Sequence, residues 1–190
     1  MKKQIKYKLE GSLQISGDKS ISHRALILSS MALGEAKISN LLESEDTLRT
    51  IKILKSLSIQ IKKFNNEWIV IGNGTNGYMQ PIEALDCGNS GTTARLMLGA
   101  VSTNPIFCTF IGDKSLSKRP MTRVTKFLNK IGAETVLTNR DYFPMTIDGA
   151  EDPLPLQHKI TKASAQIKTA LILAALNIMG KTSIIETRKT

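Results

Sequence analysis

The sequence predicts an α/β fold made of a repeated unit. Three segments begin with small polar residues, continue as a short apolar helix and end in a β-branched strand, at residues 20–41, 90–112 and 164–186. Aligning Leu26, Leu96 and Leu171 shows that these segments recur at a nearly constant spacing. A second helix and two strands follow the first two segments. The unit is therefore helix–strand–helix–strand–strand, present twice and begun a third time.

The first full unit has clear signals for its second half. Residues 44–57 are expected to form an amphipathic helix with Ser44 as N-cap and two acidic residues in the first turn, where the helix dipole favours them. Two strands follow at 59–64 and 68–71, and Asn65 and Asn66 mark the turn between them. Gly72 ends the unit.

The second unit repeats this plan. Its second helix is expected at 120–131, with Pro120 at the first helical position and Gly132 just beyond the end. Strands at 133–138 and 142–147 follow, with Asn139 at their turn, and Gly149 ends this unit as Gly72 ends the first. The third unit stops after one helix and one strand. Because an unfinished repeat leaves apolar faces without partners, we expect the chain to be part of a longer one.

Composition excludes several classes of protein. At 190 residues and 41% hydrophobic content the chain can bury a core without disulfides. The two cysteines, Cys87 and Cys108, lie in no CxxC or Cys/His cluster, so neither a disulfide scaffold nor a zinc site is expected. Cys87 is expected to be a small buried residue. The apolar stretch 170–176 is too short to cross a bilayer, and no apolar segment follows the basic N-terminus. We therefore expect a cytoplasmic protein without membrane contact.

The net charge of +10 raises a nucleic-acid alternative. The charge is uneven, since residues 1–63 hold 12 Lys and Arg whereas residues 64–110 hold only Arg95. Aromatic residues make up 5% of the chain, which is few for a base-stacking surface. A basic nucleic-acid-binding module stays open as an alternative, and it would show a steep salt dependence of binding.

The starts of the three repeated helices are the candidate site. A helix start offers unpaired backbone N–H groups that bind anions, and each of these starts carries a basic residue one turn in. The side chains gathered there suit a ligand with phosphate or carboxylate groups and hydroxyls. They are Lys19, Ser20, Arg24, Asn89, Gly91, Thr92, Arg95, Ser164, Gln166 and Lys168.

The other motifs do not indicate a specific catalytic or binding chemistry. GDKS occurs at 17–20 and at 112–115, but no GxxxxGK frame precedes either lysine, so neither is a P-loop. The spacing of the two copies does not match the repeat period, so they are interpreted as different structural positions. Arg119 lies on a loop from which it could reach a ligand. His23 and His158 have no partner for a catalytic triad, and no carboxylate pair has acid/base spacing.

Four segments together resemble the 5-enolpyruvylshikimate-3-phosphate synthase family. They read GDKSISHRA at 17–25, LDCGNSGTTAR at 85–95, GDKSLSKRPM at 112–121 and ASAQIK at 163–168. The resemblance runs over essentially the whole chain. It implies an enzyme of two domains, each an inside-out α/β prism of three βαβαββ units.

The resemblance also implies how this chain divides. Residues 1–14 are expected to form a strand of the other, absent domain. Residues 15–190 are expected to form the substrate-binding domain, with pseudo-repeats at about 15–80, 81–150 and an incomplete 151–190. The family's acid/base carboxylates lie in the second half, so the 190 residues alone are expected to bind substrate without turnover.

The implied reaction moves the enolpyruvyl group of phosphoenolpyruvate to the 5-hydroxyl of shikimate 3-phosphate and releases phosphate, in aromatic amino-acid biosynthesis. Lys19 is the expected catalytic residue and contacts both substrates. The other shikimate 3-phosphate contacts are Ser20, Arg24, Ser164, Ala165 and Gln166. The other phosphoenolpyruvate contacts are Asn89, Gly91, Thr92, Arg119 and Gln166. No cofactor or metal is implied, and the full-length form is expected to be a monomer.

Departures from the family pattern refine these expectations. Ala165 stands where many members carry Ser, so a contact there comes from the backbone. Leu96 and His23 stand where some members carry Pro and Asn. Gly91 is the small residue of glyphosate-sensitive members, so glyphosate is an expected inhibitor. The sister enolpyruvyl transferase, which acts on UDP-N-acetylglucosamine, is the other alternative, and the string Ser22-His23-Arg24 favours the shikimate enzyme.

Overall fold

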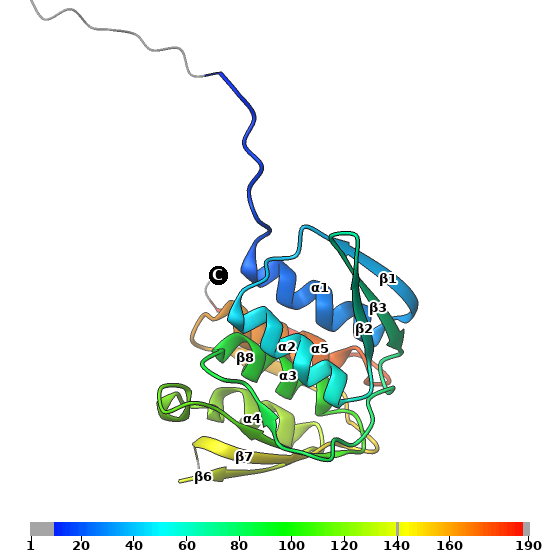
Figure 1. Cartoon of the computed structure of the whole chain (residues 1–190). Coiled ribbons are helices and arrows are strands. Elements are labelled where there is room, and N and C mark those ends of the chain that lie inside the picture. Colours follow the sequence, from blue (N-terminus) through cyan, green and yellow to red (C-terminus); the bar gives the residue numbers. More distant parts are fainter. Residues whose placement is uncertain (1–9, 140, 188–190) are drawn as a thin grey trace, which may run out of the picture.

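The computed structural model describes residues 10–139 and 141–187 (Figure 1). Its helices are α1 (Lys19–Met31), α2 (Glu45–Ser56), α3 (Gly91–Val101), α4 (Thr122–Lys130) and α5 (Ala165–Ala175), with a 3-10 turn η1 (Leu116–Lys118). Its strands are β1 (Leu33–Ser39), β2 (Gln60–Phe64), β3 (Glu67–Asn73), β4 (Leu85–Asp86), β5 (Phe107–Ile111), β6 (Glu134–Thr138), β7 (Tyr142–Asp148), β8 (Gln157–Ile160) and β9 (Ser183–Glu186). The element order confirms the predicted unit and its repetition.

The strands form three sheets that follow the repeat. The first sheet has the order β1-β3-β2 and is antiparallel. The second has the order β4-β5-β7-β6, so it repeats the first and adds β4 parallel to β5. The third pairs β8 with β9 in parallel. A strand therefore precedes the first helix of the second and third units, as in a βαβαββ unit.

The helices fill the space between the sheets. Figure 1 shows them between the β1-β3-β2 sheet at the upper right and the β6–β7 hairpin at the bottom. The helix α3 is almost wholly buried, since nine of its eleven residues are solvent-inaccessible or nearly so. It packs mainly against α5 and also contacts α1, α2 and α4, and α4 lies against α5 as well. The first helices of the second and third units therefore form the centre of the molecule, and α1 borders α3.

One close approach sets the distance between α3 and α5. A Cβ atom added at Gly99 would lie 2.2 Å from the backbone oxygen of Ala170, well inside van der Waals contact. Only hydrogen fits at this position, so the two backbones meet directly. The register of α3 against α5 follows from this contact.

A buried chain of hydrogen bonds joins α1, α2 and α3. Nδ1 of His23 is 2.8 Å from Oγ1 of Thr50, which is 2.9 Å from Oγ1 of Thr93. All three side chains are fully buried. Nε2 of His23 has no hydrogen-bond partner among the described residues. Burial lowers the pKa of His23 to about 4, so its ring is neutral at pH 7.

Most local predictions are confirmed. Ser44 caps α2 in a capping box with Thr47. Asn65 and Asn66 both have positive φ, as expected for a tight hairpin turn, and Gly132 follows α4 with φ of 108°. Cys87 and Cys108 are buried. The two GDKS strings lie at different places, as predicted, but Asp18 and Asp113 both accept a hydrogen bond from the N–H three residues on.

The predicted start of α4 is wrong. Pro120 is expected at the first helical position, whereas α4 begins at Thr122. The reason lies in the β6–β7 turn, where Asp141 accepts a hydrogen bond from the Thr122 N–H at 3.1 Å and its backbone oxygen accepts one from Met121. This carboxylate supplies the cap that starts the helix two residues later.

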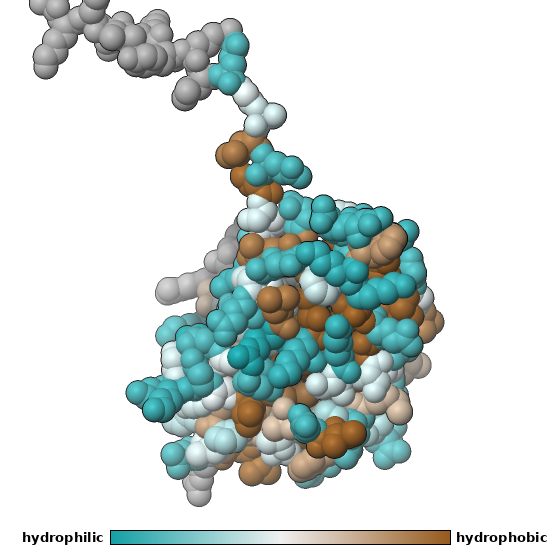
Figure 2. All heavy atoms as spheres, viewed as in Figure 1, coloured by the Kyte–Doolittle hydropathy of each residue, from teal (hydrophilic) through white to brown (hydrophobic). Residues whose placement is uncertain are grey.

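The chain before α1 has no regular structure where it is described. Residues 10–18 lead away from the body (Figures 1 and 2), and the side chains of Leu13 and Ile15 are 86% and 69% exposed. Residues 1–9 lie outside the described part, so the expected strand over 1–14 stays a prediction. Within the described residues, no helix has the length and apolar character needed to cross a bilayer.

Gly99→Ala tests the close approach of α3 and α5. Helix propensity alone would make this change stabilising. Because the methyl group would strike the Ala170 carbonyl, we expect instead a loss of about 2 kcal/mol in the free energy of unfolding, from overpacking. Urea denaturation measures it, with Ala100→Gly as the control on the same helix. A more stable Gly99→Ala protein would contradict this packing.

The lowered pKa of His23 predicts that the folded chain loses stability as the pH falls. Its pKa is lower in the folded state than in the unfolded one, so the unfolded chain binds the proton first as the pH falls. The contribution of neutral His23 to the free energy of unfolding is fully present above pH 6.5. It is lost as the pH falls through about 4, and the total loss is about 3 kcal/mol. His23→Asn keeps a hydrogen-bonding atom for Thr50 and does not titrate, so its unfolding free energy should fall less over this range. Equal slopes for parent and variant would refute the account.

Candidate functional site

The three repeated helices start with the same cap. The N-cap side chains of Asp18, Ser90 and Ser164 each accept a hydrogen bond from the backbone N–H three residues later. The basic residues, however, do not occupy equivalent positions. Arg24 is the sixth residue after its cap, Arg95 the fifth and Lys168 the fourth. Because each position on a helix turns by about 100°, the three side chains leave their helices in different directions.

Arg24 reaches from α1 to α5. Its Nε and Nη2 atoms donate to Oγ1 of Thr169 at 3.2 and 2.8 Å, and Nη1 donates to the backbone oxygen of Ser20 at 3.0 Å. The Thr169 hydroxyl in turn donates to the backbone oxygen of Ala165 at 2.8 Å. Thr169 therefore fixes the guanidinium of Arg24 beside the start of α5. Thr169 is not among the residues predicted from the sequence, where its only signal is its place one turn after Ala165.

Arg95 makes the corresponding link from α3 to α5. Its Nη1 atom donates to Oε1 of Gln166 at 3.0 Å, and the Gln166 Nε2 atom donates to Oγ1 of Thr92 at 3.0 Å. This pair of bonds orients the Gln166 amide. Burial and the nearby charges of Arg119 and Arg123 lower the pKa of Arg95. The guanidinium groups of Arg95, Arg119 and Arg123 thus place several positive charges near Gln166.

Arg119 is held by the loop before α3. Its Nη2 atom donates to Oδ1 of Asn89 at 2.6 Å and to Oγ of Ser115 at 3.3 Å. The Asn89 amide donates to Asp113 at 2.7 Å. The pKa of the Asp113 carboxyl is lowered, first by the hydrogen bond that it accepts from the Leu116 backbone N–H and then by Asn89. Asp113 is therefore an anionic anchor, and it too is absent from the residues predicted from the sequence.

Gly91 lies between these two arginines. A Cβ atom built there would be 2.7 Å from Nη1 of Arg95 and 3.2 Å from Nη1 of Arg119. The glycine therefore leaves both guanidinium groups close to the backbone N–H groups that start α3. Such an arrangement can hold an anion between two charged donors and a helix start.

Lys19 forms the edge of the site at α1. Its ammonium is 3.0 Å from Oδ2 of Asp46, in the first turn of α2, and its side chain is 51% exposed. The backbone oxygen of Asp46 accepts a hydrogen bond from the Thr93 side chain at 3.1 Å, which ties this turn to α3. The sequence predicts Asp46 only as a residue that complements the helix dipole. Its carboxylate also positions the Lys19 ammonium.

Lys168 does not join the other basic residues. Its ammonium is 2.8 Å from Glu186 on β9, within its own unit. The sequence groups Lys168 with the other side chains at the helix starts, whereas the structure pairs it with Glu186, because it is only the fourth residue after its cap and leaves its helix in another direction. The remaining predicted residues do come together around the starts of α1, α3 and α5. An adjoining hollow of about 250 Å³ is lined by Arg95, Pro120, Arg123, Ser164, Gln166 and Ile167.

The site has the chemistry of an anion-binding surface. Guanidinium, ammonium and amide donors surround Gly91 and the start of α5. Within residues 10–139 and 141–187, no group of three or more His, Cys, Asp or Glu side chains lies close enough together to hold a metal ion. The surface can thus orient a ligand with more than one anionic group.

Comparisons with known proteins agree with this geometry. The family model described as EPSP synthase (3-phosphoshikimate 1-carboxyvinyltransferase) matches residues 3–190. Proteins named 3-phosphoshikimate 1-carboxyvinyltransferase from Ruegeria sp. (strain TM1040) and Paracoccus denitrificans (strain Pd 1222) are 49% and 47% identical over 183 residues. In each case the match covers 96% of this chain and 41% of the relative.

A solved structure shows the same fold. The EPSP synthase from Acinetobacter baumannii superposes with a TM-score of 0.90 at 36% identity, covering 95% of this chain and 41% of that one. The chain therefore spans about two fifths of the length of the relatives that it matches. From the family model, the relatives and the shared fold, the chain belongs to the EPSP synthase family.

Proposed function

We propose that the starts of α1, α3 and α5 bind shikimate 3-phosphate and phosphoenolpyruvate for enolpyruvyl transfer. The observation that carries this is the pair of guanidinium groups, from Arg95 and Arg119, that flank the bare backbone of Gly91 next to the oriented Gln166 amide. Both substrates carry a phosphate group, and phosphoenolpyruvate also carries a carboxylate. A site with several fixed cationic donors suits such a pair of anions.

Shikimate 3-phosphate would lie between α1 and α5. Arg24, Ser20 and Lys19 face it from α1, and Ser164, Ala165 and Gln166 from α5. Thr169 supports this role because it fixes Arg24 with two hydrogen bonds. Ala165 carries only a methyl group, so its contribution is the backbone N–H at the helix start. The remaining N–H groups of Arg24 stay available for a phosphate or hydroxyl oxygen.

Phosphoenolpyruvate would lie over Gly91. Arg119, held by Asn89, and Gln166, held by Arg95 and Thr92, would contact its anionic groups. In the transfer, the C2–O bond to phosphate breaks, C2 bonds to the 5-oxygen of shikimate 3-phosphate, and the hydroxyl proton ends on the released phosphate. Lys19 would stabilise the negative charge on the departing phosphate by exchanging Asp46 for the ligand.

Titration of the 190-residue chain with shikimate 3-phosphate, followed by NMR, tests this function. We expect saturable shifts at the starts of α1 and α5, and none with UDP-N-acetylglucosamine. Thr169→Val should weaken binding about tenfold because Arg24 loses its acceptor, whereas Thr169→Ser should bind within about twofold of the parent. Phosphate release should stay at background, since the family's other half is not in this chain. Absence of any shift would contradict the proposal, whereas measurable turnover would contradict only the expectation that the 190 residues alone are inactive.

Gly91→Ala tests the phosphoenolpyruvate pocket and the expected inhibition by glyphosate. The added methyl group must displace Nη1 of Arg95 and crowd Arg119. With shikimate 3-phosphate present, we expect glyphosate and phosphoenolpyruvate both to bind about tenfold or more weakly, as guanidinium contacts are lost. The affinity for shikimate 3-phosphate should change little. Unaltered glyphosate binding in the variant would argue against this placement.

A further inference from the structure

Two equivalent seams of the repeat differ in charge. The first lies between α2 and β4, where Arg49 pairs with Asp86 and, at 3.7 Å, with Glu45. The second lies between α4 and β8. Both seams join the second helix of one unit to the first strand of the next, so they can be compared residue by residue.

The backbone supports this comparison, because corresponding residues of the two seams are separated by the same number of positions in the sequence. Beyond α2, the N–H of Ile59 donates to Leu54, and beyond α4 the N–H of Ala133 donates to Leu128. Ser58 and Gly132 follow the two helices with positive φ. The caps Ser90 and Ser164, which begin α3 and α5, have the same offset. Arg123 is therefore the equivalent of Arg49, and Ile160 that of Asp86.

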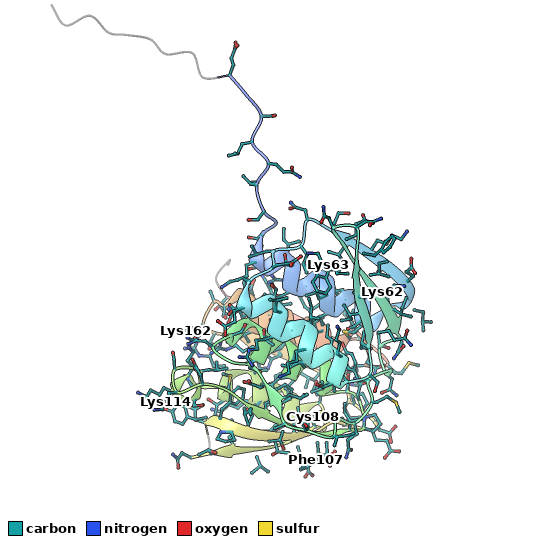
Figure 3. The ribbon with its side chains drawn as sticks, viewed as in Figure 1. Lys62, Lys63, Phe107, Cys108, Lys114 and Lys162 are labelled. Carbon is teal, nitrogen blue, oxygen red and sulfur yellow. The ribbon has the colours of Figure 1, made fainter. Side chains whose placement is uncertain are left out.

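The second seam lacks the carboxylate that neutralises the first. Its hollow, of about 260 Å³, is lined by Arg123, Lys126, Lys159 and Lys162, together with Thr161 and Ile167. In the described part of the chain, none of these four basic side chains has a carboxylate within 4 Å. Figure 3 shows Lys162 at the left edge of the molecule, away from Lys62 on β2. Four basic residues thus line one hollow, without the counter-charge that the repeat supplies at the equivalent place.

The hollow also adjoins the candidate substrate site. Arg123 and Ile167 line both this hollow and the one that contains Arg95 and Gln166. An anion at the seam would thus lie next to the expected phosphoenolpyruvate contacts without using Arg119, Asn89 or Gly91. The two places are neighbouring but separate.

We propose that the α4–β8 seam is a second anion site, which binds a dianionic oxyanion such as a phosphate group in the place of the carboxylate of Asp86. The Arg123 fork provides paired donors to phosphate oxygens, and the lysines add point charges around it. This site is distinct from the one proposed for the substrates, and its existence does not depend on that function.

Inorganic phosphate is the probe, titrated into the 190-residue chain by NMR at constant ionic strength. We expect saturable shifts at Arg123, Lys126, Lys159 and Lys162, both without and with saturating shikimate 3-phosphate. Thr161→Asp places a carboxylate in the lining of this hollow, one residue after the equivalent of Asp86, and should weaken phosphate binding at these residues at least about tenfold, by competing with the ligand. Thr161→Asn has the same size without the charge and should bind within about twofold of the parent.

A pair of lysine variants distinguishes binding at a specific site from general attraction of phosphate to a basic protein. Lys126→Gln and Lys62→Gln remove the same charge, but only the first should weaken binding at the seam, about threefold or more. Equal effects of the two variants, or phosphate shifts that Thr161→Asp leaves intact, would overturn the proposal. So would the loss of all seam shifts once shikimate 3-phosphate is bound. If shikimate 3-phosphate itself does not bind, the proposal about the substrate site fails. The NMR shifts that inorganic phosphate causes at the seam still test the proposal of a second anion site.

Discussion

The direct contact of α3 with α5 at Gly99 is the constraint on which the site depends. Arg95 and Gln166 are 71 residues apart and Arg24 and Thr169 are 145 apart, so no local preference brings them together. Their hydrogen bonds of 2.8–3.2 Å tolerate only a few tenths of an ångström. Backbone-to-backbone packing at Gly99 gives that accuracy to the bond between Arg95 and Gln166, because it leaves no flexible side chain between α3 and α5.

The repeated units share their backbone structure but differ in side chains at equivalent positions. Caps, turns and sheet orders recur between the units, and the offset between Ser90 and Ser164 holds at several other points. At equivalent positions the chemistry nevertheless differs, as with Asp86 and Ile160. A repeated fold therefore supplies several similar helix starts, and each can be specialised by a few substitutions. The basic residue of each helix start likewise stands at a different distance from its cap and has a different partner.

Local signals made much of the fold predictable from the sequence. The Ser44 cap, the Asn65–Asn66 turn and the Gly132 stop involve neighbours in the chain, so the sequence contains their whole cause. The start of α4 was misplaced because its cap, Asp141, comes from a hairpin. Likewise, the helix starts pointed to most site residues, whereas the role of Arg119 came from the family resemblance alone. Its holder, Asn89, is 30 residues away, and no pattern in the sequence reports that bond.

The distribution of charge connects stability with binding. Lys19 and Arg49 are neutralised by Asp46 and Asp86, whereas burial, and then repulsion by Arg119 and Arg123, lowers the pKa of Arg95. The repulsion costs folding free energy, and the packing of α3, α4 and α5 holds the groups in place against it. An anion that binds among them relieves the repulsion without any rearrangement of the donors. Since such a ligand binds the folded chain alone, it raises the free energy of unfolding by RT ln(1 + L/Kd), where L is the free ligand concentration. The same packing that opposes this repulsion therefore also holds the guanidinium groups in place for the anion proposed to bind among them.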